Sequence, residues 1–102
     1  MKPVRTRPKA DDDIDRATAF LLQESPAAAV GLLDALEHDF ATLARQPGVG
    51  SQRYAHLIPG QTLRMWPVSG YPWLIFYFEH PDHLEVIRVL HSRRDMPVAL
   101  GE

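Results

Sequence analysis

The sequence lacks cysteine, long apolar runs and any lysine beyond Lys9. Without cysteine, the chain forms no disulfide, thiolate metal site or cysteine nucleophile, so an intracellular setting is the simplest expectation. No apolar stretch approaches the roughly 20 residues that a bilayer span requires, so we expect no membrane partner. Acidic residues, rather than the apolar run of a secretion signal, follow Lys9. These absences predict a cytoplasmic protein.

The remaining composition predicts one globular domain over residues 1–102. The chain is 45% hydrophobic and 24% charged, and at this size roughly two-thirds of the unfolded surface can be buried. The net charge of −2 disfavours general electrostatic capture of nucleic acid. Residues 41–78 nevertheless contain three arginines and no acidic residue, so a local arginine cluster remains open.

The densest apolar stretch lies between Tyr71 and Pro97. Residues 74–78, LIFYF, are strand-forming and bounded by turn residues, which predicts a central strand buried on both faces. Pro81 and Asp82 supply a turn, and residues 83–91 return as the partner strand. Alternation places four side chains of this strand on one face, namely Leu84, Val86, Arg88 and Leu90.

Two helices precede this hairpin. Aspartates crowd the start of a first helix that stops near Glu24, and Ser25 and Pro26 are typical of the start of a second. The second helix has an apolar face at steps of four and three, formed by Ala29, Leu33, Leu36, Phe40 and Leu43. Gly31 makes this helix thin enough for the first to approach closely. We expect an antiparallel helical hairpin.

The fold class follows from the order of elements. Residues 3–7 indicate a short edge strand, and residues 62–68 indicate a strand that leads into the central one. The prediction is an α+β domain in which an N-terminal strand and a helical hairpin pack on an antiparallel sheet, formed mainly by a C-terminal three-stranded meander. Residues 98–102 are expected to be a frayed tail.

Ordinary catalytic and metal motifs receive little support. His80 and His83 flank the turn at Asp82, but a third metal ligand is missing from this loop, so we predict no metal and no cofactor. The serines fit caps and turns, and no nucleophile elbow or phosphate-binding loop is present. No catalytic residue is assigned from these patterns.

The arginines are the remaining candidates for function. Strands and strand ends bring four of them toward one sheet surface: Arg64, Arg88, Arg93 and Arg94. Arginine forks bind phosphate or carboxylate at two points, so this surface suits RNA, a nucleotide or an acidic protein. The alternative is internal pairing with Glu85, Asp95 or Glu79. For the strand residue Arg88 this alternative is at least as strong, because an unpaired buried charge costs several kcal/mol.

A family resemblance bears on this choice. The pattern YPWLIFYF, a short turn and then VIRVLHSRRDMP resembles the closing hairpin and C-terminal signature of the ParE branch of the RelE/ParE toxin superfamily. The resemblance implies a RelE/ParE-like fold and the toxin of a type II toxin-antitoxin pair. By resemblance, such a protein is not an enzyme: it traps the complex of DNA gyrase with cleaved DNA and arrests growth.

The resemblance also implies partners and contact residues. The target-binding candidates for gyrase are Trp73, Arg88, His91, Arg93, Arg94, Met96 and Pro97. The implied second partner is a ParD-like ribbon-helix-helix antitoxin, with operator DNA reached only through it. An amphipathic segment of the antitoxin needs an apolar groove or an open strand edge. The candidates for that contact are Leu22, Val30, Leu32, Arg64 and Trp66.

Two alternatives remain open. A RelE-like toxin cleaves messenger RNA on the ribosome with lysine, arginine and a C-terminal tyrosine or histidine, and His91 is the residue here that fits such a role. General-base work by lysine is not available after Lys9. The same fold also suits a non-toxic binding module, because fold does not fix function.

Overall fold

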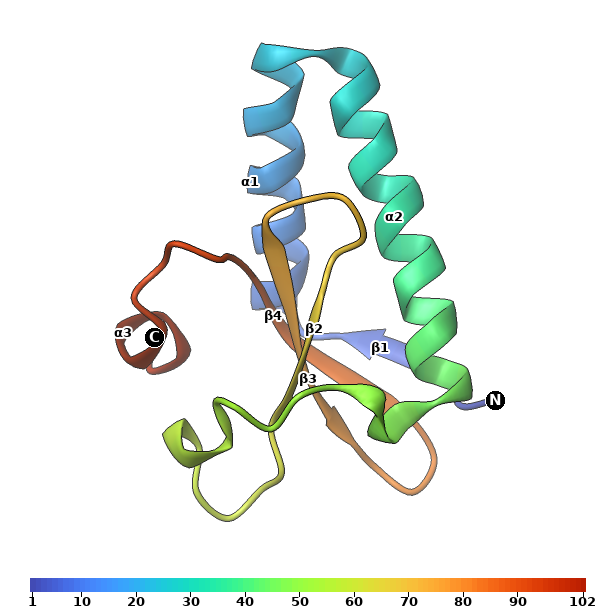
Figure 1. Ribbon diagram of the computed structural model, residues 1–102, viewed down its shortest axis with the longest axis vertical. Helices are drawn as coiled ribbons and strands as arrows, with labels where there is room; N and C mark the ends of the chain where they lie inside the picture. The colour runs from blue at the N-terminus through green and yellow to red at the C-terminus, as the bar shows by residue number, and fades with distance from the viewer.

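The computed structural model describes all 102 residues, arranged as a four-stranded sheet with a projecting helical hairpin (Figure 1). The elements are β1 (Val4–Thr6), α1 (Pro8–Glu24), α2 (Pro26–Arg45), β2 (Arg64–Pro67), β3 (Trp73–Glu79), β4 (Leu84–His91) and α3 (Met96–Leu100). Two short 3-10 turns, η1 (Pro47–Val49) and η2 (Ala55–Leu57), lie between α2 and β2. No helix is both long enough and apolar enough to cross a membrane.

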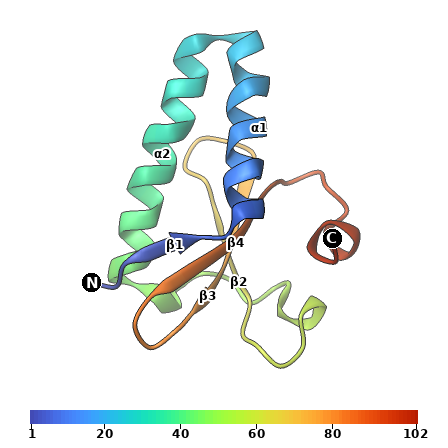
Figure 2. The same cartoon turned by 180° about the vertical axis from the view of Figure 1, so that it is seen from behind.

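The sheet has the strand order β1-β4-β3-β2. Strands β2, β3 and β4 form an antiparallel meander, whereas β1 pairs with β4 in parallel, with Val4 opposite Leu84. The view from behind shows β1 running beside β4 at the foot of the hairpin (Figure 2). This arrangement confirms the α+β fold expected from the sequence.

The second helix of the hairpin begins after Ser25, as the sequence predicts. The Ser25 hydroxyl accepts a hydrogen bond from the backbone N–H of Ala28 at 3.3 Å, and Pro26 occupies the first helical position. The predicted apolar face of α2 is wrong at one step, because Leu32 is buried and Leu33 is 46% exposed. Steps of three and four suit either residue, and the position of the sheet decides between them.

Gly31 meets a different neighbour from the one expected. A side chain at this position would collide with the hydroxyl of Tyr71, not with α1. That hydroxyl donates a hydrogen bond of 2.8 Å to the carbonyl oxygen of Ala28. The thin part of α2 therefore receives the loop between β2 and β3, which ties that loop to the helix.

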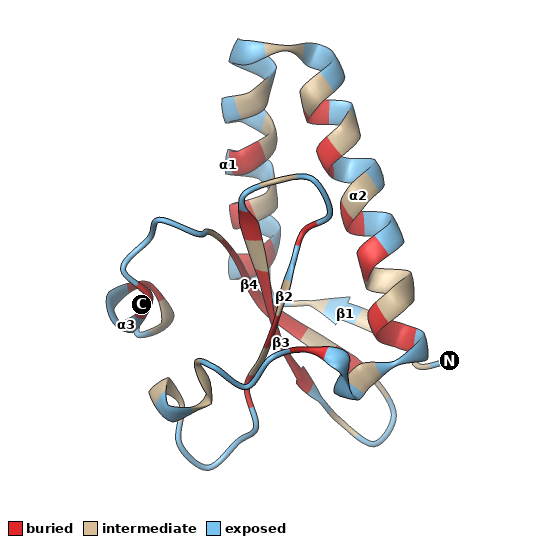
Figure 3. Ribbon diagram, in the orientation of Figure 1, coloured by how far each residue is buried: buried red, intermediate tan, exposed pale blue.

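Both faces of the sheet are buried, as the run of five apolar residues in β3 predicts (Figure 3). The cluster beneath the hairpin consists of Ala10, Ala17, Leu32, Leu36, Leu43, Val68, Trp73, Ile75, Tyr77, Leu84, Val86 and Val89. The cluster on the opposite face consists of Leu63, Met65, Phe76, Phe78, Ile87, Leu90, Met96 and Ala99. We call these two sides the hairpin face and the tail face.

A bulge in β4 changes which side chains share a face. Tyr77 pairs with Val86, but the preceding residue, Phe76, pairs with Arg88, so Ile87 is an extra residue in β4. The alternation therefore shifts: Val86 lies on the hairpin face and Leu90 on the tail face. The expectation that these residues and Arg88 share one face is wrong. A single inserted residue cannot be recognised from the alternation of side chains in the sequence.

The segment after β4 is ordered as a helix. Met96 and Ala99 of α3 are buried in the tail-face cluster, and the Asp95 carboxylate accepts a hydrogen bond from the N–H of Val98 at 3.3 Å. Pro97 lies in the first turn, where its missing N–H is not needed. The expected frayed tail is thus wrong for residues 98–100, because a cap and two buried side chains hold this turn.

Candidate functional site

Arg88 and Asp13 form a buried ion pair that joins three elements. Both residues are less than 10% exposed. The Arg88 guanidinium donates to both oxygens of the Asp13 carboxylate, through Nε at 2.7 Å and Nη2 at 2.9 Å. Its Nη1 donates to the carbonyl oxygen of Ala99 at 2.8 Å. The pair therefore connects α1, β4 and α3 around one charge.

The place of Asp13 follows from the shortness of β1. Because β1 ends at Thr6, the edge of β4 beyond Val86 has no strand partner. The first turns of α1 cross this edge, and Asp13 Oδ2 accepts a hydrogen bond from the N–H of Val89 at 3.0 Å. One carboxylate thus accepts hydrogen bonds both from a backbone N–H at the unpaired edge of β4 and from a buried guanidinium.

This ion pair supports the second of the two interpretations of Arg88, in which its charge is paired within the protein. The hydrogen bonds that Arg88 donates to Asp13 raise the pKa of Arg88 above its ordinary value, so the side chain stays charged. The expected partners are all engaged elsewhere: Arg7 binds Glu85, Lys2 binds Glu79, and Asp95 caps α3. Asp13 was missed because it lies 75 residues away and reads as one of several acidic residues at a helix start.

An exposed cationic surface follows β4 directly. We call it the tail surface and define it as His91, Arg93, Arg94 and Pro97. Arg93 has no ion-pair partner, while Arg94 Nη2 lies 3.1 Å from Glu102 Oε1. His91 Nδ1 accepts a hydrogen bond from the N–H of Arg93 at 3.1 Å, so the proton of a neutral ring is on Nε2.

A hollow of about 150 Å³ adjoins the tail surface, between α1 and the end of β4. Its lining consists of Asp13, Arg16, Ala17, Phe20, Trp73, Val89, Leu90, His91 and Arg94, and we call it the α1 hollow. Three rings run across it, with centroids 6.4 Å apart for Phe20 and Trp73 and 5.0 Å apart for Trp73 and His91. Ribbon views from both sides show the segment after β4 beside α1 (Figures 1 and 2).

The α1 hollow joins predicted residues with two that sequence reasoning missed. Trp73, His91 and Arg94 were predicted as target contacts, whereas Arg16 and Phe20 were not. Phe20 is 55% exposed, although its aromatic type suggests core. The sequence did contain an indication of this exposure, because Phe20 lies beside the apolar stripe of Ile14, Ala17 and Leu21 in α1 and not within it.

The other predicted target contacts divide by exposure. Trp73, Arg88 and Met96 are buried, so none of the three projects from the surface, although Trp73 lines the α1 hollow. Arg93, Arg94 and Pro97 are exposed and His91 is half-buried. The accessible candidates therefore coincide with the tail surface.

The predicted antitoxin contacts on the helices also divide. Leu22 and Val30 are 52% and 59% exposed near the tip of the hairpin, whereas Leu32 is fully buried and unavailable. Phe20 and Leu33 add exposed apolar surface that the sequence reading did not assign. The hairpin thus exposes four large apolar side chains, namely Phe20, Leu22, Val30 and Leu33.

The edge of the sheet at β2 is not open. Ser51 exchanges two backbone hydrogen bonds of 2.8 Å with Met65, on the side of β2 away from β3. The guanidinium of Arg64 donates to the carbonyl oxygens of Gly48 and Gly50, and Trp66 Nε1 lies 3.5 Å from Asp39 Oδ1. An added strand at β2 would have to displace this loop.

The hydroxyl of Tyr77 holds the loop of residues 47–50 by two hydrogen bonds. The Tyr77 hydroxyl donates to the carbonyl oxygen of Pro47 at 2.7 Å and accepts from the N–H of Gly50 at 3.0 Å. Burial raises the pKa of Tyr77 above its ordinary value, so the hydroxyl stays protonated and can donate. A side chain at position 50 would collide with this ring.

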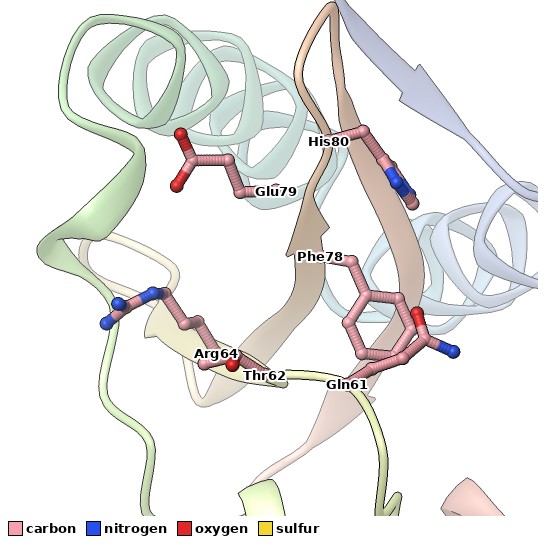
Figure 4. A pocket seen from close by; sticks show the side chains of 6 residues that line it. All are labelled: Gln61, Thr62, Arg64, Phe78, Glu79 and His80. Atoms are coloured by element: carbon pink, nitrogen blue, oxygen red, sulfur yellow. The ribbon is translucent and has the colours of Figure 1, made fainter.

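The largest hollow, about 330 Å³, opens beside the start of β2 and the end of β3 (Figure 4). Its lining consists of Gln61, Thr62, Arg64, Phe78, Glu79 and His80. Figure 4 shows Arg64 and Glu79 on one side and Phe78 and His80 on the other. The charged groups already have partners: Arg64 binds the η1 loop, Glu79 binds Lys2 and His80 binds Glu85. This hollow offers no free acid, base or nucleophile with a matched partner.

The histidines of the β3–β4 turn stack on one another, with ring centroids 4.5 Å apart. His83 Nδ1 lies 2.7 Å from Asp82 Oδ1, and this hydrogen bond lowers the pKa of Asp82. The hydrogen bond from Arg7, with a smaller one from His80, lowers the pKa of Glu85. No three histidine, aspartate or glutamate side chains come close enough together to hold a metal ion.

Comparison with known proteins gives a consistent result. The family model described as "ParE toxin of type II toxin-antitoxin system, parDE" matches residues 4–96. A chain of the solved structure described as "Chromosomal ParDE TA system from P. aeruginosa" is similar in fold, with a TM-score of 0.71 and 16% sequence identity. The similarity covers 89% of this chain and 96% of that chain. No curated protein matches the sequence.

Proposed function

The chain belongs to the ParE toxin family of type II toxin-antitoxin systems, and from this premise we propose that it inhibits DNA gyrase by trapping the complex of gyrase with cleaved DNA. In this proposal the protein is an inhibitor and not an enzyme. It binds its target through the tail surface and stabilises a state that gyrase itself creates.

The observation that carries this proposal is the rigid presentation of two arginines. Arg93 and Arg94 lie between β4 and α3, and Arg88 fastens both elements by hydrogen bonds within the core. A segment whose two ends are anchored loses less conformational entropy on binding than a mobile one. The arrangement supports recognition of an acidic surface, because the backbone that carries both arginines is held on each side by the Arg88 network.

A second partner is part of the proposal. We assign neutralisation to a ParD-like ribbon-helix-helix antitoxin, which also makes the contacts to operator DNA. Its amphipathic segment covers two exposed apolar side chains near the tip of the helical hairpin, Leu22 and Val30. The blocked edge of β2 favours a helix across the hairpin over an added strand at β2.

The test uses reconstituted gyrase with supercoiled plasmid and ATP. The purified protein, freed of antitoxin, is expected to accumulate linear DNA that is covalently attached to protein and appears after detergent and protease. An Arg93→Ala, Arg94→Ala variant should lose this effect by at least about tenfold, which corresponds to about 1.4 kcal/mol. The matched control is Arg5→Ala, Arg45→Ala, which removes two exposed arginines that have no side-chain partner.

Two results would contradict the proposal. Equal loss in both double variants would show a dependence on net charge, not on the tail surface. No linear DNA from a natively folded wild-type protein would reject gyrase as the target. The next assay would then be cleavage of messenger RNA on ribosomes, with His91→Ala as the variant, because His91 is an acid or base beside two arginines.

A further inference from the structure

We propose that the α1 hollow is a second part of the target-binding surface and receives one apolar side chain of gyrase that lies next to a carboxylate. This inference rests on the proposed function and names the chemistry of the gyrase segment. It adds Arg16 and Phe20 of α1 to the residues that recognise the target.

The apolar floor of the α1 hollow sets the first half of this chemistry. Ala17, Trp73, Val89 and Leu90 line it, and Phe20 forms an exposed wall. A volume of about 150 Å³ suits a single side chain and is too small for a helix. A large aromatic residue that is 55% exposed beside such a floor gains contact area when an apolar group enters.

Hydrogen-bond donors at the rim set the second half. Arg16 makes no ion pair within 4 Å, and Arg94, whose Nη2 lies 3.1 Å from Glu102 Oε1, has further N–H donors and also lines the hollow. His91 uses Nδ1 to accept from the backbone, so Nε2 of the neutral ring carries a proton and has no partner within the protein. Three donors around an apolar floor match a carboxylate next to an apolar side chain.

The charges around the hollow favour a protein over a nucleic acid. Asp12 and Asp15 are exposed on α1 on either side of the buried Asp13. Their carboxylates repel a continuous row of phosphates. A single carboxylate can contact the arginines without approaching Asp12 or Asp15. A net charge of −2 adds to the same effect.

Continuity with the tail surface identifies the partner as gyrase. His91 and Arg94 belong to both the α1 hollow and the tail surface, so one protein that covers the arginines also reaches the hollow. Leu22 and Val30, assigned to the antitoxin, do not line the hollow. The two partners therefore use different exposed side chains of the helical hairpin.

The experiment measures gyrase poisoning by Phe20→Ala and Arg16→Gln variants of the full chain. Each is expected to need at least about tenfold more protein for half-maximal linear DNA. The matched controls are Leu33→Ala, an apolar residue of α2 that is 46% exposed and has no assigned contact, and Arg45→Gln. Both controls should stay within about twofold of wild type. Circular dichroism and thermal unfolding verify that each variant folds.

Three outcomes would overturn the inference. If Phe20→Ala and Arg16→Gln poison gyrase as well as wild type does, the hollow plays no part. If Leu33→Ala fails equally, the effect belongs to the whole hairpin. If Phe20→Ala and Arg16→Gln weaken binding of a labelled DNA duplex without gyrase, measured by fluorescence anisotropy, the hollow contacts nucleic acid. Inactive wild-type protein would reject the proposed function itself, which separates the two failures.

Discussion

The two faces of the sheet are covered by different kinds of structure. The hairpin face lies under two helices of 17 and 20 residues, whose apolar stripes supply most of the contact. The tail face lies under the 3-10 turn η2, its flanking loop and a helix of five residues. Short segments cannot hold themselves in place by periodic burial, because isolated helices of this length are unstable.

The difference teaches where polar groups matter for this fold. The tail face is held by the Arg88 network and the Asp95 cap, both within a few residues of the tail surface. On the hairpin face, the buried Asp39 serves a smaller purpose and fastens one turn. The position of the tail surface therefore depends on polar anchors, while the hairpin face depends on apolar area.

Removal of the Arg88 anchor should produce the largest effect. Arg88→Met leaves Asp13 buried without its partner and frees the carbonyl oxygen of Ala99, which should lower the free energy of unfolding by about 3–5 kcal/mol. The measurement is urea unfolding. An Asp13→Leu, Arg88→Met variant should recover part of the loss, but not all, because Val89 N–H then lacks an acceptor. A single-variant loss below about 1 kcal/mol would contradict a polar anchor.

Removal of the Asp39 anchor should cost less. Its carboxylate accepts from Ser69 N–H at 2.8 Å and from the Ser69 hydroxyl at 2.7 Å. Asp39→Ala should lower the free energy of unfolding by about 2–3 kcal/mol, since these donors lose their acceptor. Asp39→Asn keeps one acceptor and should lose less. Hydrogen exchange should report faster opening at the turn of residues 68–71 and no change in α3; faster exchange in α3 would show that the two faces are coupled.

The smallest effect concerns acid stability at the end of the tail face. The pKa of Glu85 is lower in the folded protein, first because of the hydrogen bond from Arg7, so this pair stabilises the fold above the ordinary pKa of 4.5. That stability is lost as the pH falls through the folded pKa. Arg7→Met should cost well under 1 kcal/mol at pH 7, roughly what a partly exposed pair contributes. Thermal unfolding of both proteins from pH 7 to pH 3 should converge at the acid end, and a constant difference would implicate packing of Arg7 on Phe78.

Much of the fold could be predicted because its signals are local. The run of residues 74–78, the turn at Pro81 and the helix start at Ser25 each specify their own conformation. The choice between Leu32 and Leu33 could not be made, since both continue the same stripe and the sheet decides. The bulge at Ile87 and the helix α3 were not predicted, because one is a single inserted residue and the other has only five residues, too few to show a repeating apolar pattern.

The candidate site was predicted in outline but not in composition. Exposed Arg93 and Arg94 follow from their place after a strand. The partner of Arg88 did not follow, because charge complementarity within a chain of 13 acidic residues does not identify one of them. Phe20 and Arg16 join the site through tertiary contact of α1 with the end of β4, which no local pattern encodes.

The parallel pairing of β1 with β4 has a consequence for the order of assembly. Val4 finds its partner at Leu84, so the sheet cannot close during synthesis until nearly the whole chain has emerged from the ribosome. The long loop that this pairing closes also slows spontaneous folding. The tail surface follows β4 in the chain and is completed last. A nascent chain can therefore form the helical hairpin before it can form the tail surface.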